Sequence, residues 1–142
     1  MGIDDVARPQ MKFEVVIVDD ETAVSKMMSM TLEKNGFHVK TYTSAYDALQ
    51  ALKIQKPHLL ISDIGLVGMN GFELYREAIK IHPDLQIIFS SGNIYELDSK
   101  GLTAGMQLTL DNFLQKPMSC QQLVERAEYF CKKSLLTDTH KN

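Results

Sequence analysis

Four short apolar segments of the sequence each end at a polar or charged side chain. These side chains are Asp19 with Asp20, Asp63, Ser91 and Lys116. If the segments are parallel strands of one sheet, their carboxyl ends lie at a single edge, where such sheets bind their ligands. Three carboxylates brought together there repel one another and raise one another's pKa, which a bound cation relieves. The pattern therefore predicts a cation site at this edge.

The ligand types favour Mg²⁺ and phosphoryl chemistry. Carboxylate oxygens without nearby histidine or cysteine are typical of a magnesium site that shares its ion with phosphate oxygens. A carboxylate can attack phosphorus to form an aspartyl phosphate. Charge on that product is neutralised by a metal ion, a lysine and a hydroxyl donor. Lys116 and a serine hydroxyl stand at the predicted edge, so the residue set supports phosphoryl transfer to an aspartate.

The elements that must position these side chains alternate along the chain. Apolar, β-branched runs predict strands at 13–18, 37–42, 58–62, 86–90 and 112–115. Helical spacing predicts four helices. The first begins at Thr22 and ends at Asn35 and Gly36, and the second follows an N-cap at Ser44. The third covers about 72–79 and the fourth about 123–131. A further helix is expected early in 93–110, followed by an irregular loop. This alternation predicts an α/β fold: a doubly wound, five-stranded parallel sheet with helices on both faces.

Length and composition narrow the class of protein. The 142 residues predict one domain, placed at 12–133 between a polar N-terminal extension at 1–11 and a fraying C-terminal tail at 134–142. No apolar run approaches the roughly 18–20 residues of a membrane span. A net charge of −3 without a basic stripe gives little support to nucleic-acid binding. Cys120 and Cys131 suit neither a disulfide framework nor a zinc site, so we expect reduced thiols and a cytoplasmic protein.

Plainer interpretations exist for single residues. Asp19 and Asp20 alone could be the acidic pair that a helix N-terminus favours. Asp63 alone could be a loop carboxylate, and Lys116 before Pro117 is a common turn. The functional interpretation rests on the occurrence of all four groups, each at the end of a predicted strand.

Four segments, in this order, resemble the motifs of response-regulator receiver domains. They are 15–20 (VVIVDD), 63–71 (DIGLVGMNG), 87–92 (IIFSSG) and 113–117 (FLQKP). The resemblance covers about residues 12–133 and implies the flavodoxin-like receiver fold. Each motif alone is weak evidence, whereas four in order at strand ends identify the chain as a member of this family.

The resemblance implies roles for the charged residues. Asp63 would be the phosphoacceptor. Asp20 would bind Mg²⁺ directly and Asp19 through a water molecule, with Asp63 and the backbone carbonyl of Gly65 as further ligands. Lys116 would pair with the Asp63 carboxylate or its phosphoryl oxygens.

The resemblance also implies a switch. Ser91 would donate a hydrogen bond to the phosphoryl group. Ser90 is the alternative candidate for this role, since either serine could end the strand. Ser91 is favoured because Gly92 follows it, and in the family a small residue follows the hydroxyl. Phe113 would occupy the aromatic switch position, which turns inward on activation, although it replaces the more usual tyrosine and lacks a hydroxyl. The segment between Ser91 and Lys116 is somewhat longer than usual.

The implied function is that of a phosphoacceptor in a two-component or phosphorelay system. It would take a phosphoryl group from a phosphohistidine onto Asp63 with Mg²⁺ and signal by a conformational switch. The expected donor is a histidine kinase or histidine phosphotransfer protein, because none of the four histidines has a phosphodonor pattern. The expected target is a separate protein, since 134–142 is too short for an output domain. We expect no direct contact with nucleic acid or membrane, and a phosphorylation-dependent homodimer stays open.

Other functions are less well supported. A turnover enzyme with an aspartate nucleophile would want a second aspartate two residues later, where this chain has Gly65, so we expect no enzyme acting on a free substrate. A non-phosphorylating interaction module should have lost Asp20, Asp63 or Lys116, and all three are present. A receiver domain excised from a larger regulator or hybrid kinase stays an open alternative.

Overall fold

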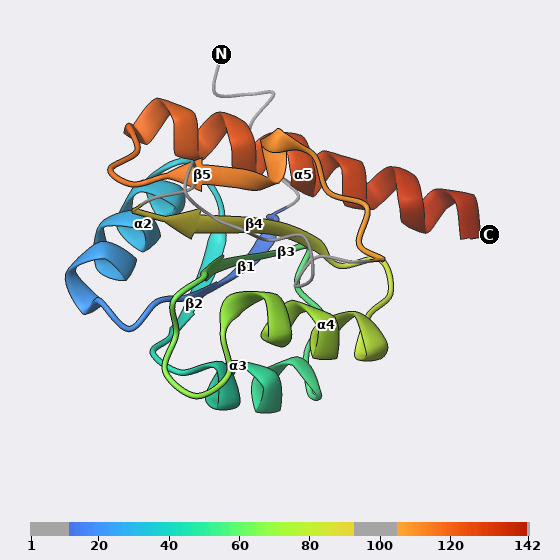
Figure 1. Cartoon of the computed structure of the whole chain (residues 1–142). Helices are drawn as coiled ribbons and strands as arrows, with labels where there is room; N and C mark the ends of the chain where they lie inside the picture. The colour runs from blue at the N-terminus through green and yellow to red at the C-terminus, as the bar shows by residue number, and fades with distance from the viewer. Residues whose placement is uncertain (1–11, 93–104, 142) are drawn as a thin grey trace, which may run out of the picture.

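A five-stranded parallel sheet lies between two layers of helices (Figure 1). The computed structural model describes residues 12–92 and 105–141, with side chains as far as residue 136. Strand order is β2-β1-β3-β4-β5, with α2 and α5 on one face and α3 and α4 on the other, which confirms the predicted fold class. The elements are β1 (Glu14–Val18), α2 (Thr22–Lys34), β2 (His38–Tyr42), α3 (Ala45–Leu52), β3 (Leu59–Asp63), α4 (Gly71–Ile81), β4 (Gln86–Ser91), η2 (Leu110–Asn112), β5 (Phe113–Gln115) and α5 (Cys120–Lys141).

Side chains from the central strands alternate between two hydrophobic clusters. The cluster under α2 and α5 includes Val15, Ile17, Leu59, Ile61, Ile88, Leu114, Met28, Leu32, Leu123 and Phe130. The cluster under α3 and α4 includes Val16, Val18, Leu60, Ile87, Phe89, Ala48, Leu52, Phe72 and Ala78. Successive strand residues point to opposite faces, and helices bury both faces of the sheet, so the central strands are apolar almost throughout. This alternation also decides on which face each side chain at a strand end lies.

Local signals explain where several helices begin and end. The Ser44 hydroxyl accepts a hydrogen bond from the Asp47 backbone N–H at 3.1 Å, so the predicted N-cap of α3 is confirmed. Gly36, just after α2, has a φ of 91°, a conformation that suits glycine and confirms the predicted helix end. Asn70 and Glu73 form a reciprocal capping box at the start of α4, with bonds of 2.8 and 2.9 Å. This capping box was not predicted.

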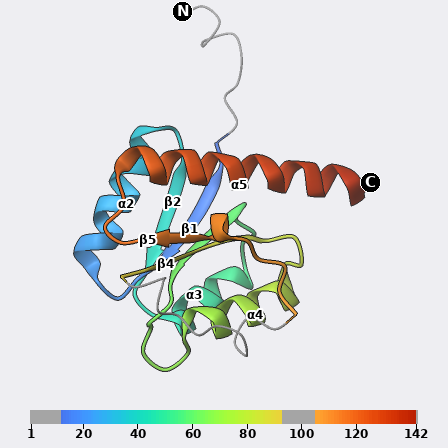
Figure 2. The same ribbon diagram turned by 45° about the horizontal axis from the view of Figure 1, so that its top comes forward.

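The segment 134–142 differs from the predicted fraying tail, because α5 continues to Lys141. Ser134 is still buried against the domain, and its hydroxyl donates to the Cys131 carbonyl oxygen at 2.7 Å. Packing therefore persists beyond the residue at which the apolar spacing of the helix stops being regular. Figures 1 and 2 show the last turns of α5 projecting past the edge of the sheet.

Smaller differences occur near the candidate site. Asn112 was predicted to begin the last strand but lies in η2, where its side chain donates to the Ile87 carbonyl oxygen at 2.8 Å. Asp63 and Ser91 are the last residues of β3 and β4, whereas the predicted strands ended one residue earlier. The helix expected early in 93–110 falls mainly on 93–104, which lie outside the described residues, as does the extension at 1–11.

Candidate functional site

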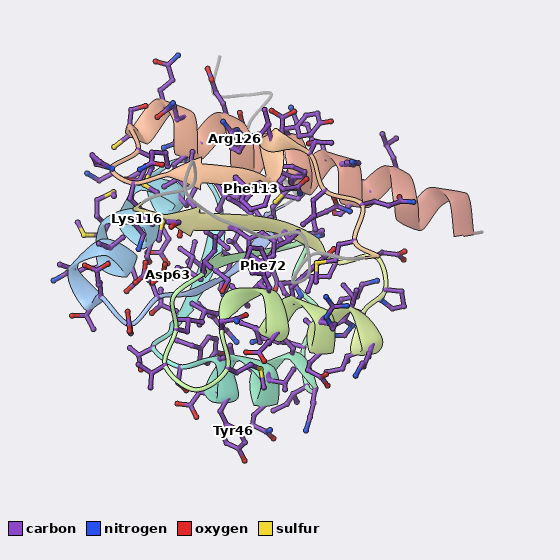
Figure 3. All side chains as sticks on the ribbon, in the orientation of Figure 1. Tyr46, Asp63, Phe72, Phe113, Lys116 and Arg126 are labelled. Atoms are coloured by element: carbon purple, nitrogen blue, oxygen red, sulfur yellow. The ribbon has the colours of Figure 1, made fainter. Side chains whose placement is uncertain are left out.

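The carboxyl ends of β1 and β3 bring three aspartates together. Asp63 ends β3, and Asp19 and Asp20 follow β1, which pairs with β3 so that Val18 lies opposite Ser62. One carboxylate oxygen from each aspartate lies within 4.8 Å of the others. Figure 3 shows Lys116 at the same edge as Asp63, although it comes from the end of β5. The structure thus brings together charged residues from three segments that are far apart in the sequence.

Asp19 and Asp20 are neighbours in sequence but have opposite surroundings. Asp19 is fully buried, and both its oxygens are bonded, one to the Glu21 backbone N–H at 2.9 Å and the other to the Lys116 ammonium at 2.8 Å. Asp20 is exposed to solvent. Asp19 is therefore held in a fixed position, while Asp20 presents an accessible carboxylate.

Lys116 reaches three carboxylates from the end of β5. Its ammonium lies 2.8 Å from Asp19, 3.3 Å from Glu21 and 3.5 Å from Asp63. Burial favours the neutral amine, but the hydrogen bond and charge of Asp19, together with Asp63 and Glu21, outweigh it and raise the pKa of Lys116 above its ordinary value. The lysine is therefore held as a cation beside the candidate acceptor. Glu21 was not among the predicted site residues. Its position directly after Asp19 and Asp20 could have indicated that it belongs to the site.

Asp63 has a pKa above the ordinary value of an aspartate. Burial is the main cause, and the negative charges of Asp19 and Asp20 add to it. The Lys116 ammonium and a hydrogen bond from the Gly65 backbone lower this pKa without cancelling the effect. A carboxylate with a raised pKa is more basic and binds a cation or electrophile more readily. Gly65, whose carbonyl was predicted to bind a metal, thus lies next to Asp63, because its backbone N–H donates a hydrogen bond to the Asp63 carboxylate.

The N-terminus of α4 packs directly against the backbone of Asp63. The Gly71 N–H donates to the Ile64 carbonyl oxygen at 2.9 Å, and a Cβ at Gly71 would overlap the carbonyl oxygen of Asp63. Ser62 also donates its hydroxyl to that oxygen, at 2.9 Å. Position 71 therefore requires glycine for close approach rather than for a special φ. Gly71 belongs to the 63–71 motif, but the motif alone does not reveal this packing.

Ser91 and Phe113, predicted to form the switch, lie on the face covered by α4. Ser91 is half-buried, and its carbonyl oxygen accepts from the Lys116 backbone N–H at 2.8 Å. The Phe113 ring packs against Phe89 and Phe72, with ring centroids 5.6 and 6.4 Å apart. The aromatic ring thus already contacts the core beside α4 (Figure 3).

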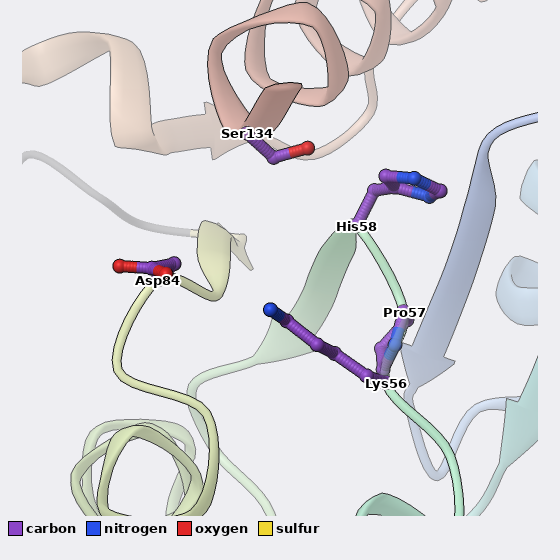
Figure 4. A pocket seen from close by; sticks show the side chains of 5 residues that line it. All are labelled: Lys56, Pro57, His58, Asp84 and Ser134. Atoms are coloured by element: carbon purple, nitrogen blue, oxygen red, sulfur yellow. The ribbon is translucent and has the colours of Figure 1, made fainter. Parts of the chain in front are cut away.

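The opposite edge of the sheet has a hollow of a different kind. A cavity of about 50 Å³ is lined by Lys56, Pro57, His58, Asp84 and Ser134 (Figure 4). This volume holds a few water molecules but no organic ligand. The cluster of Asp19, Asp20 and Asp63 lies at the other, carboxyl edge of the sheet.

The donor set at the carboxyl edge fits a magnesium ion. Three carboxylates (Asp19, Asp20 and Asp63) cluster here, and the one ammonium of Lys116 pairs with two of them and with Glu21, so the cluster has an excess of negative charge. Hard oxygen ligands with an accessible carboxylate suit Mg²⁺, which retains several waters. The residues present therefore match the cation that the sequence predicted.

Comparison with known proteins agrees with this geometry. The family model of the response regulator receiver domain matches residues 15–128. The chain belongs to the response regulator receiver domain family. The transcriptional regulatory protein CreB of Escherichia coli is 29% identical over 112 residues, which are 79% of this chain and 48% of CreB. The C4-dicarboxylate transport transcriptional regulatory protein DctD of Rhizobium meliloti is 34% identical over 113 residues, 80% of this chain and 24% of DctD.

A solved structure shares the fold. The CheY-like receiver domain protein of Methanospirillum hungatei aligns with a TM-score of 0.77 at 24% identity, covering 89% of this chain and 99% of the other. The chain spans about half the length of CreB and about a quarter of the length of DctD. Receiver domains are signalling modules of two-component systems, and a phosphoacceptor role follows from the family. Within the described part of the chain, no helix has the length and apolar character needed to cross a membrane.

Proposed function

We propose that this receiver domain accepts a phosphoryl group on Asp63 from a phosphohistidine of a separate kinase or phosphotransfer protein, with the help of Mg²⁺. The observation that carries the proposal is that Asp63 lies 3.5 Å from the Lys116 ammonium and beside Asp19 and Asp20. Two reduced cysteines, one exposed and one buried, agree with a cytoplasmic location for this exchange.

The transfer is a displacement at phosphorus. A carboxylate oxygen of Asp63 forms the new P–O bond as the P–N bond to the donor imidazole breaks, and the bonding electron pair stays on the imidazole nitrogen. The raised pKa of Asp63 makes the attacking oxygen more basic. Lys116 stays cationic and neutralises charge on the phosphoryl oxygens.

Asp20, Asp63 and the Gly65 carbonyl are the proposed direct ligands of Mg²⁺, and Asp19 would act through a water molecule. The fixed, doubly bonded Asp19 and the exposed Asp20 agree with this division. When bound, the ion supplies positive charge to the phosphoryl oxygens. Lys116 and the metal would then oppose the charge of the phosphoryl group from two sides.

The proposed donor-docking surface is formed by α2 and the start of α5 beside Lys116. Met27 and Met30 on α2 are 37% and 48% exposed, and Cys120 at the start of α5 is exposed as well. Thr31 links the two helices, since its hydroxyl lies 3.5 Å from the Cys120 sulfur. Exposed methionines adapt to a partner's apolar surface, so the proposed partner here is the helical bundle that carries the phosphohistidine.

The proposed output is a shift between two packings of the face that carries Ser91 and Phe113. Ser91 would be drawn toward the phosphoryl group, and the backbone bond between Ser91 and Lys116 would carry that movement to β5. The recipient would be another protein, or another domain where the chain is part of a longer regulator, as in CreB and DctD.

The test is intact-mass measurement after incubation with acetyl phosphate and Mg²⁺. We expect one added phosphoryl group in the wild-type chain, and none in Asp63→Asn or in the presence of a chelator. Asp47→Asn is the matched control, because Asp47 is an exposed aspartate on α3, and it should retain the adduct.

Two outcomes would contradict the proposal. An adduct that survives Asp63→Asn would place the acceptor elsewhere. No adduct in a folded wild-type chain, together with no binding of beryllofluoride, would favour a non-phosphorylating interaction module on the same fold.

A further inference from the structure

Ser90 has a buried hydroxyl that the proposed mechanism does not use. The residue is fully buried, and its oxygen has no hydrogen-bond partner among the described residues. Buried hydroxyls normally have a partner, and an unpaired one destabilises the fold. The presence of a serine here, rather than a small apolar residue, therefore has to be explained.

The sheet places Ser90 on the same face as the charged site residues. Ile88, two residues earlier on β4, packs in the cluster under α2 and α5, so Ser90 faces the same side. Ile61 and Leu114 belong to that cluster too, which puts Asp63 on this face and directs Lys116, just past the end of β5, toward it. In the β3–β4 pairing, Ser90 lies directly opposite Asp63.

Ser91 lies on the other face. Phe89, two residues before it, belongs to the cluster under α3 and α4, together with the ring of Phe113. The two adjacent serines of β4 thus approach the end of the sheet from opposite sides. Ser91 is connected with the aromatic switch, and Ser90 with the acceptor.

Lys116 reaches its partners across the end of β4. β4 lies between β5, after which Lys116 stands, and β3, which ends at Asp63 (Figure 1). Ser90 pairs with Leu114 on β5 and with Asp63 on β3, so it is the β4 residue beside Asp63 on the face toward which Lys116 is directed. A small side chain leaves room for the lysine, but alanine would do so without an unpaired hydroxyl.

We propose that Ser90 is a second hydroxyl donor of this site, whose hydrogen bond forms with an oxygen of the phosphoryl group on Asp63. Neighbouring strands are about 4.8 Å apart, so a rotation of the serine side chain directs its hydroxyl toward the group opposite. The hydroxyl is unpaired without the phosphoryl group and paired with it. This inference rests on the proposed phosphorylation of Asp63, and it adds a donor on the face opposite Ser91.

The experiment measures the affinity for beryllofluoride with Mg²⁺ by calorimetry, and the Tm of the ligand-free chain. Beryllofluoride stands in for the phosphoryl group on the aspartate. Ser90→Ala should weaken the affinity about three- to tenfold, as expected for one lost hydrogen bond, with an unchanged or higher Tm. Ser90→Cys keeps the shape of the side chain with a weaker donor and should lose less affinity.

Ser134→Ala is the matched control, because Ser134 is a buried serine on α5 whose hydroxyl bonds to Cys131, away from the site. It should bind beryllofluoride like the wild type. Wild-type affinity in Ser90→Ala would overturn the inference, and so would a lowered Tm, which would mean that the hydroxyl is already paired in the free chain. Failure of the wild-type chain to bind beryllofluoride would instead overturn the proposed function.

Discussion

Replacement of Lys116 by methionine should destabilise the Mg²⁺-free chain strongly. The substitution keeps the length of the side chain and removes the ammonium, which leaves the buried carboxylate of Asp19 without its charged partner at 2.8 Å. Removing one partner of a buried ion pair costs about 3–5 kcal/mol. Asp19 retains the hydrogen bond from the Glu21 backbone, so the lower end, about 3 kcal/mol, is expected. For a domain of this length, that corresponds to a fall in Tm of roughly 6–12 °C.

The assay is urea unfolding, with and without Mg²⁺. Magnesium binding stabilises the folded state by about 2.7 kcal/mol at 100 times its Kd. Because the ion also neutralises the carboxylates, the difference in free energy of unfolding between Lys116→Met and wild type should be smaller when Mg²⁺ is present.

Lys80→Met is the matched control for this substitution. Lys80 also forms an ion pair at 2.8 Å, with Glu77, but its side chain is 66% exposed and that of Glu77 is 42% exposed. Such pairs contribute less than about 1 kcal/mol, so little change is expected. Equal stability of Lys116→Met and wild type in the absence of Mg²⁺ would refute the argument that Asp19 depends on the lysine.

Further predictions concern the acceptor and the surfaces around it. Burial and neighbouring charges raise the pKa of Asp63 in the folded state, so its favourable contribution to stability is lost as pH rises through that pKa; Asp63→Asn should therefore stabilise the Mg²⁺-free chain in urea at pH 7, and the gain should disappear once the pH falls below the ordinary pKa of an aspartate. Gly71→Ala should lower both Tm and the rate of phosphorylation by acetyl phosphate, since the added methyl group displaces the Asp63 backbone; an unchanged rate would mean that this packing does not position the acceptor. Phe113→Ala should cost about 1–3 kcal/mol in urea, because the half-buried ring contacts Phe89 and Phe72, and a smaller loss would contradict the inward packing. Met30→Glu should slow transfer from a phosphohistidine donor without affecting acetyl phosphate, whereas Ile54→Glu, at a side chain 87% exposed after α3, should affect neither rate.

The alternation of apolar runs and helical spacing was sufficient to predict the sheet, its helices and the edge at which polar groups gather. This worked because a strand buried on both faces must be apolar along its length, so a carboxylate at its end stands out in the sequence. Asp63 and Lys116 were identifiable for that reason. Local capping chemistry made Ser44 predictable in the same way, because a cap depends on residues three positions apart.

The sequence did not predict features that depend on distances across the sheet. Residue type and spacing do not distinguish the burial of Asp19 from that of Asp20, and only the tertiary structure shows that Asp19 is buried against Lys116 and Asp20 is exposed. The requirement for glycine at position 71 comes from the approach of α4 to the end of β3, and the continuation of α5 past residue 134 comes from packing on the domain.

The two serines of β4 illustrate the physical reason. Because they are consecutive in a strand, their side chains are predicted to face opposite sides of the sheet, but the sequence does not indicate which side carries Asp63. That depends on strand order and pairing register, which bring Ser90 opposite Asp63. Sequence by itself determined the types of chemical group and the strand ends at which they stand, because burial and backbone propensity act locally. Tertiary structure decided which of those groups meet, because contacts between strands join residues that are dozens of positions apart.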